Sequence, residues 1–144
     1  MTEALDEETV AALRAAVLVL ARRLRYQVAG DDVPNATEMA VLGRVGRCGP
    51  MTPGQLARAE HVQPPSMTKV IESLEARGML RREPHPTDGR QYLVSRTELA
   101  EEFVTASKQV RSAWLASHLA GLSAADQQAI AAAAPALARL AEQP

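Results

Sequence analysis

The sequence has few cysteines, few aromatic residues and no excess of basic residues. Each shortage argues against a class of structure or function. A single cysteine, Cys48, excludes an internal disulfide and favours a reducing compartment. Aromatic residues make up only 3% of the 144 residues, so alanine, leucine and valine must fill the core, which favours helices. The net charge of −1 lacks the basic excess that nucleic-acid binders often show, and it argues mildly against that class.

Long apolar runs and catalytic motifs are also missing. No apolar stretch approaches the roughly 18 residues of a membrane span, and the acidic start does not have the order of a secretory signal. We therefore expect a cytoplasmic protein with a single domain over residues 1–144. No phosphate loop, paired carboxylates or nucleophile with a base is recognisable, so we expect no enzyme. Cys48 and the three histidines lack metal-ligand spacing, so we expect neither a metal nor a cofactor.

Apolar residues recur at helical spacing in six segments. The first helix is predicted from about Asp6 to Val28, and the others are predicted to begin at caps provided by Thr37, Thr52, the Pro64-Pro65 pair, Thr97 and Ser123. Pro135 should kink or split the sixth helix, and Cys48 should be a buried, inert thiol. The predicted inward faces comprise Met39, Leu42 and Val45, then Met67, Val70, Ile71 and Leu74, then Leu99, Phe103, Val110 and Trp114.

Charge is sorted along the chain. The start is acidic, whereas residues 77–96 hold five arginines against two acids. Within this stretch, "REPHPTDGRQYLV" (Arg82–Val94) changes from helical to extended patterning around an Asp88-Gly89 turn. This pattern predicts a basic two-stranded hairpin with an exposed loop histidine, His85.

The third and fourth helices meet across the short turn "EHVQPP", and the hairpin follows at once. That order predicts a helix-turn-helix with a wing. The polar face of the fourth helix begins with Gln63, Ser66, Thr68 and Lys69, side chains that pair with base edges or phosphate. A helix N-terminus also favours phosphate, so DNA contact should be limited to the first two turns of this helix.

Several segments, taken in order, resemble the MarR family of bacterial transcription regulators. They are "TEMAVLGRV", "TPGQLA", "QPPSMTKVI", "LEARGMLRR", "TDGRQYLV" and "SRT". The chain departs from the family pattern at Gln63 and Pro65, at Lys69 in place of arginine, and at Arg96 in place of leucine. The resemblance implies a mainly α fold with a small β-hairpin, in which residues 37–97 form a winged helix-turn-helix lobe between dimerisation helices at about 5–29 and 98–142.

The resemblance also implies a function: sequence-specific binding of double-stranded DNA by a homodimeric repressor that a small, often aromatic ligand releases. Arg90 at the wing tip would enter the minor groove, which attracts arginine, while Asp88 orients the arginines of the wing and Gly89 permits the tight turn. The predicted DNA-binding residues are Thr52, Gln63, Pro64, Pro65, Ser66, Thr68, Lys69, Arg82, Asp88, Gly89 and Arg90.

The terminal helices have apolar stripes that the DNA-reading segments do not use. A two-fold dimer would cover these stripes and would predict a roughly palindromic operator; a monomer folding them onto its own core is the alternative. The predicted dimer interface is Leu5, Val10, Leu13, Leu115, Leu119, Ile130, Leu137 and Leu140. By analogy, the ligand pocket would use Val17, Leu20, Arg22, Arg25, Leu42, Val45 and Phe103. The alternative function is a winged-helix protein-interaction module that does not bind DNA.

Overall fold

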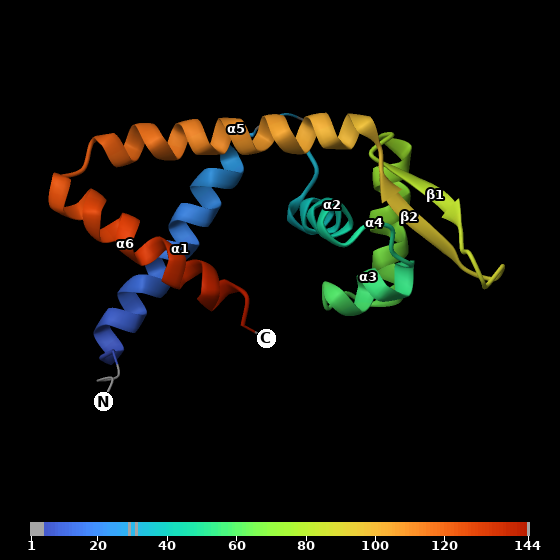
Figure 1. Cartoon of the computed structure of the whole chain (residues 1–144), viewed down its shortest axis with the longest axis horizontal. Coiled ribbons are helices and arrows are strands. Elements are labelled where there is room, and N and C mark those ends of the chain that lie inside the picture. The colour runs from blue at the N-terminus through green and yellow to red at the C-terminus, as the bar shows by residue number, and fades with distance from the viewer. Residues whose placement is uncertain (1–4, 29, 31, 144) are drawn as a thin grey trace. The chain divides into compact units, whose positions relative to one another are not determined.

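The computed structural model describes residues 5–28, 30 and 32–143, and its secondary structure is six helices and one two-stranded hairpin (Figure 1). This confirms the predicted fold class. None of the helices described is both long and apolar enough to cross a membrane. The elements are α1 (Glu7–Tyr26), α2 (Ala36–Cys48), α3 (Pro53–Ala59), α4 (Pro64–Ala76), β1 (Leu80–Pro84), β2 (Tyr92–Arg96), α5 (Glu98–Ala120) and α6 (Ala124–Ala141).

The chain forms two compact units. The winged unit spans Gly30–Lys108, and the helical unit combines Met1–Ala29 with Gln109–Pro144, so the boundary between them falls inside α5. Every buried hydrophobic residue among those described belongs to the winged unit, in which side chains from α2, α3, α4, the hairpin and the start of α5 form one cluster. Its members are Val41, Leu42, Val45, Leu56, Ala57, Met67, Ile71, Leu74, Met79, Leu80, Val94, Ala100 and Val104.

The helix starts follow local capping chemistry. Thr52 accepts the Gln55 N–H at 3.2 Å, which confirms the predicted cap of α3, and the Gln55 side chain accepts the Thr52 N–H at 2.9 Å, which completes a capping box. The predicted Thr37 cap of α2 is wrong, because Asn35 caps the helix and Thr37 lies inside it. Asn35 forms a second capping box with Glu38, and two paired backbone donors outweigh a single cap two residues later.

The hairpin is anchored to the segment that precedes α3. Its strands pair antiparallel from Leu80 opposite Arg96 to Pro84 opposite Tyr92, and its tip extends away from α2–α4 (Figure 1). Met51, just before α3, exchanges two backbone hydrogen bonds with Val94 at 3.1 and 2.8 Å. The wing is therefore fixed to the segment that starts the helix-turn-helix.

Two expectations about side-chain burial fail. The inner face of α5 in the winged unit is Ala100, Val104 and Ser107, so Leu99 and Val110 are exposed. Large apolar residues guided that prediction, whereas the buried positions are small or β-branched. Cys48 is exposed because it ends α2 beyond the buried Val45. Of the two outcomes expected at Pro135, a split does not occur, because α6 runs unbroken from Ala124 to Ala141. Ser95 is buried, and its hydroxyl donates to Glu83 Oε1 at 2.6 Å.

Arg96, where the family pattern has leucine, generates a stability prediction. Its guanidinium donates to the Leu42 carbonyl at 3.2 Å and to Glu101 Oε1 at 2.6 Å, and a Cβ added at Gly46 would overlap it. We expect Gly46→Ala to lower the free energy of unfolding by about 1–2 kcal/mol, because losing these charge-assisted bonds outweighs the gain in helix propensity. Urea denaturation measures this change.

Gly43→Ala in the same helix is the matched control. A Cβ there meets only the tip of the Arg47 side chain, at 3.1 Å, so propensity should raise the free energy of unfolding by about 0.5–1 kcal/mol. Equal stabilities for the two alanine variants would contradict the role assigned to Arg96.

Candidate nucleic-acid interface

The face of α4 away from the core carries the predicted base-reading side chains. Met67, Ile71 and Leu74 are buried, whereas Gln63, Pro64, Pro65, Ser66, Thr68 and Lys69 are all exposed. Because the buried positions fix the rotation of the helix, these polar residues share the opposite surface over its first two turns. Thr68 donates its hydroxyl to the Pro64 carbonyl at 3.1 Å, which leaves the hydroxyl oxygen as an acceptor.

The N-terminus of α4 is poor in backbone donors. Pro64 and Pro65 have no N–H, and the Met67 N–H bonds to the Gln63 carbonyl at 3.0 Å. Among the described residues, Ser66 therefore holds the one backbone N–H in this turn that remains available for a phosphate. The general attraction of phosphate to a helix N-terminus is weakened here, and side chains must carry more of the contact.

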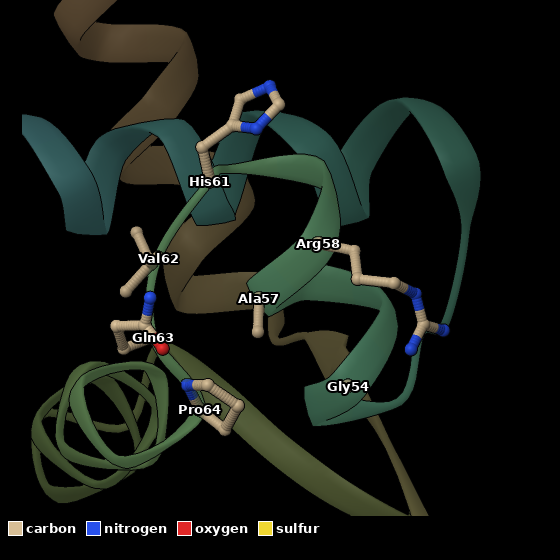
Figure 2. A pocket seen from close by; sticks show the side chains of 7 residues that line it. All are labelled: Gly54, Ala57, Arg58, His61, Val62, Gln63 and Pro64. Atoms are coloured by element: carbon tan, nitrogen blue, oxygen red, sulfur yellow. The ribbon is translucent and has the colours of Figure 1, made fainter.

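An open hollow of about 500 Å³ lies between α3 and the start of α4. Figure 2 shows Gly54, Ala57 and Arg58 from α3 on one side and Gln63 and Pro64 on the other. The turn that joins the sides contains His61 with φ 53°, a left-handed backbone that non-glycine residues rarely adopt. This conformation lets the chain reverse sharply between the two helices.

The wing loop is held by its own side chains. His85 is half-buried rather than exposed, because its Nδ1 accepts the N–H groups of Thr87 at 3.2 Å and Asp88 at 3.0 Å. Asp88 accepts the backbone N–H of Arg90 and the side chain of Gln91, both at 3.0 Å. Hydrogen bonds from the Arg90 N–H and from Gln91 lower the pKa of Asp88 below its ordinary value. Asp88 therefore positions Arg90 through the backbone rather than through its guanidinium.

Gly89 does not serve the turn in the way expected. Its φ lies outside the left-handed region, and a Cβ added there would meet open space. The turn itself therefore does not require glycine at this position.

The arginines of residues 77–96 are mostly paired with acids. Arg77 bonds to Glu38 at 2.6 Å, Arg81 to Glu83 at 3.2 Å, Arg82 to Glu75 at 2.6 Å, and Arg96 to Glu101 at 2.6 Å. In the part of the chain that the structure describes, Arg90 is the one arginine of this segment without an ion pair. The excess of arginines over acids in this segment therefore overstates the positive charge that is available to contact DNA.

Two predicted DNA-binding side chains have structural partners. Thr52 is buried, and its hydroxyl is used in the cap of α3. The Arg82 guanidinium lies 4.3 Å from the centroid of the Tyr92 ring as well as against Glu75. The hydrogen bond to Glu75 raises the pKa of Arg82 above its ordinary value.

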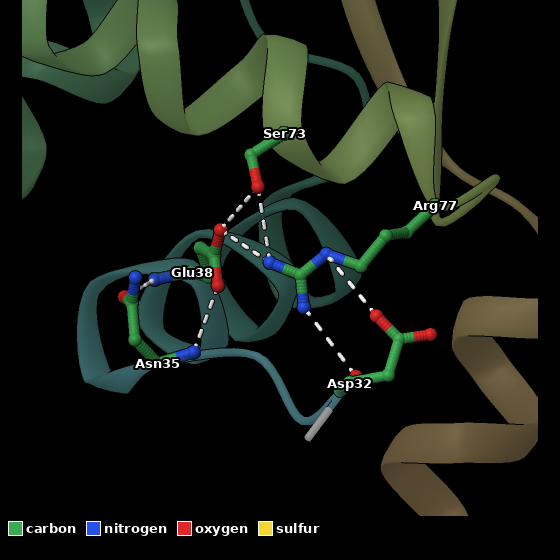
Figure 3. A network of polar contacts seen from close by, with 5 residues as sticks. All are labelled: Asp32, Asn35, Glu38, Ser73 and Arg77. Atoms are coloured by element: carbon green, nitrogen blue, oxygen red, sulfur yellow. Dashed lines mark hydrogen bonds and ion pairs between the residues drawn. The ribbon is translucent and has the colours of Figure 1, made fainter.

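A polar network behind α4 was not predicted from the sequence (Figure 3). Glu38, only 4% exposed, accepts the Ser73 hydroxyl at 2.7 Å and an Arg77 N–H at 2.6 Å on Oε1. Its Oε2 accepts the Asn35 N–H at 2.8 Å. The one available signal was Glu38 standing three residues after Asn35, which is capping-box spacing. Its partners on α4 lie 35 and 39 residues away, beyond any local pattern.

The predicted ligand residues are divided between the two units. Leu42 and Val45 are in the apolar core and Phe103 packs against it, so the side chains of Leu42 and Val45 serve packing. Val17, Leu20, Arg22 and Arg25 are exposed on α1 in the helical unit. Of the predicted interface residues, Leu5, Val10, Ile130, Leu137 and Leu140 are exposed, and Leu13, Leu115 and Leu119 are half-buried.

The buried Glu38 predicts an acid sensitivity. Burial acts to raise its pKa, but hydrogen bonds from Ser73, the Asn35 N–H and Arg77 outweigh burial and lower the pKa below its ordinary value. A lowered carboxyl pKa gives stability that is present above the ordinary value and is lost as pH falls through the folded-state pKa. We expect urea midpoints to drop below about pH 4.3, and to drop less in Glu38→Gln. Glu72→Gln, at an exposed site, is the control; equal acid slopes in both variants would refute the prediction.

Comparisons with known proteins agree with this architecture. A sequence model of the MarR family matches residues 35–92. An HTH-type transcriptional regulator of Mycobacterium tuberculosis is 39% identical over 138 residues, or 96% of each chain. A Pseudomonas aeruginosa protein described as a transcriptional regulator has a solved structure with a TM-score of 0.83 and 30% identity, covering 95% of this chain and 96% of that one.

A further solved structure has the same fold at lower identity. Bordetella bronchiseptica BpsR, whose DNA binding is regulated by 6-hydroxynicotinic acid, has a TM-score of 0.66 and 21% identity, with all of both chains covered. A winged helix-turn-helix, an exposed reading face on α4 and near-full-length relatives that are transcriptional regulators lead to one conclusion. This chain belongs to the MarR family of DNA-binding transcriptional regulators.

Proposed function

We propose that the chain acts as a homodimeric, sequence-specific repressor that binds double-stranded DNA and that a small aromatic acid releases. The observation that carries the DNA contact is the exposed polar face at the start of α4 together with the unpaired Arg90 on the wing. Gln63, Ser66, Thr68 and Lys69 have the chemistry to read base edges in the major groove, and Arg90 suits the minor groove. Such a role belongs where the chromosome lies, in the cytoplasm of a bacterium.

The exposed apolar side chains of the helical unit support the homodimer. Neither α1 nor α6 buries a single residue, although both carry large apolar side chains. Leu5 is 66% exposed and Leu140 54% exposed, and a second copy of the chain would remove such side chains from water. A two-fold dimer requires two half-sites about one helical turn, roughly 34–36 Å, apart, and hence a roughly palindromic operator.

The release step draws on one solved structure of the same fold and on exposed arginines of α1. Regulation of BpsR by 6-hydroxynicotinic acid supports an aromatic acid as the effector class. Arg22 and Arg25 on α1 are exposed and would pair with its carboxylate, beside Val17 and Leu20. Leu42 and Val45 are left out of this proposal because their side chains are in the core.

The alternative, a winged-helix module that binds proteins only, lacks a supporting observation. The near-full-length relative is an HTH-type transcriptional regulator, which favours regulation of transcription. An enzymatic role has no support from these relatives either.

The homodimer generates a prediction about mass in solution. Size-exclusion chromatography with light scattering should give twice the 15.4 kDa chain mass at micromolar concentration. Leu137→Glu should shift the mass toward the monomer, because a charge buried in an apolar interface without a partner is costly. Gln128→Glu, an exposed position on the same helix, should leave the mass unchanged. A wild-type protein that elutes as a monomer would disprove the dimer.

The wing generates a prediction about affinity. Binding should be measured by fluorescence anisotropy on a duplex that wild-type protein selects from a randomised pool, at two salt concentrations. Arg90→Ala should weaken binding about ten-fold, or roughly 1.4 kcal/mol, and flatten the salt dependence, because a cation that displaces counterions is lost. Arg139→Ala on α6 removes the same charge from the helical unit and should bind like wild type. If both variants bind equally well, the wing assignment is wrong.

A further inference from the structure

The polar network of Figure 3 joins three segments of the winged unit. It connects the N-terminal turn of α2, the C-terminal turns of α4 and the segment that precedes α2. Arg77 donates to Ser73 Oγ at 3.0 Å as well as to Glu38, and it reaches the Asp32 carbonyl at 3.5 Å and the Asp32 carboxylate at 4.0 Å. One guanidinium therefore contacts every part of the network except the cap residue Asn35.

We infer that Glu38 and Arg77 are positioning residues that hold the recognition helix α4 on α2 in the orientation needed to read base edges. The inference rests on the proposed DNA contact and names residues that lie behind that contact. Neither side chain belongs to the exposed reading face, since Glu38 is buried and Arg77 is bonded to it. Both would act on DNA through the placement of Ser66, Thr68 and Lys69.

The core alone leaves part of that placement open. Met67, Ile71 and Leu74 attach α4 by apolar contact, which is strong but non-directional. Hydrogen bonds to Glu38 are directional. Ser73 donates at 2.7 Å and Arg77, the C-cap of α4, donates at 2.6 Å, and the two residues are about one helical turn apart. Two such bonds to one carboxylate oxygen limit both sliding and rotation of α4 against α2.

Distance turns a small tilt into a large displacement. The network grips α4 near its C-terminal end, and the reading residues lie about 11 Å away along the helix axis at about 1.5 Å per residue. A tilt of about 10° would move those side chains by about 2 Å. Because a hydrogen bond is formed only over about 2.7–3.2 Å, such a shift would lose the base contacts while the fold survives.

A role in stability alone is the competing explanation. Breaking one partner of a buried ion pair destabilises a protein whether or not that pair positions anything. The experiment must therefore measure discrimination between DNA sequences in protein that remains folded, and it needs a control that breaks a similar pair elsewhere.

The chain offers such a control in Glu60. Glu60 accepts from Arg44 at 2.7 Å, and this ion pair joins α2 to the end of α3 rather than to α4. Glu38→Gln and Glu60→Gln make the same chemical change and the same change in net charge. The net charge therefore differs from wild type by the same amount in both variants, so this charge change alone does not distinguish their electrostatic attraction to DNA.

The measurement is the affinity for a duplex selected by wild-type protein divided by the affinity for a scrambled duplex of the same length. It is made at a temperature and pH where urea denaturation proves each variant folded. We expect Glu38→Gln to lower this ratio about ten-fold and Glu60→Gln to leave it within about two-fold. If Glu38→Gln does not fold, Ser73→Ala removes one bond to the same carboxylate and should lower the ratio in the same direction.

The outcomes separate the two proposals. A wild-type protein that selects no duplex contradicts the DNA-binding function itself. A wild type that discriminates, beside a folded Glu38→Gln or Ser73→Ala variant that discriminates equally well, overturns only the positioning role. A lower ratio in Glu60→Gln equal to that in Glu38→Gln also overturns it, because the effect would then not belong to α4.

Discussion

Burial of one face of α4 is the constraint on which the rest of the winged unit depends. Met67, Ile71 and Leu74 follow the 3.6-residue period, and once they enter the core, Ser66, Thr68 and Lys69 on the opposite side of the helix face outward. The same core receives Val94 from the hairpin, so the wing is attached beside the helix rather than free of it. A single set of apolar contacts thus fixes which side chains α4 exposes and where the wing begins.

Most arginines of residues 77–96 are paired with acids, so few charges in this segment stay unpaired. Glu75 and Glu83, which would repel DNA if unpaired, are bonded to Arg82 and Arg81. In each such pair the charges of the acid and the arginine cancel, so neither side chain adds to the net charge that faces DNA. This explains how a chain with a net charge of −1 can bind a polyanion: the potential over a small surface matters more than the total. Among the described residues, Arg58, Lys69 and Arg90 are exposed cations near this surface without an ion pair.

Local patterns in the sequence were enough to predict the order of elements, the caps at Thr52 and Ser123, and the buried face of α4. These features depend on neighbours within a few residues, so a single sequence contains them. The partners of Glu38 and Arg96 lie tens of residues away, and only the fold brings them together. For that reason sequence reasoning regarded Arg82 as free to bind DNA, when it is bonded to Glu75 within the chain.

The two units differ most in what they bury, and this difference links folding to function. Most of the stability of a helix in a protein comes from packing of its apolar face, and neither α1 nor α6 buries a residue within the chain. Each large apolar side chain removed from water contributes about 1.5–3 kcal/mol, so their stability calls for a partner surface. A second copy would also double the reading faces and free cations. One copy would contact phosphate through few cations, such as Arg58, Lys69 and Arg90, and joining two half-sites converts the second binding event into an intramolecular one. Dimerisation would then be a condition of useful affinity as well as of a stable helical unit.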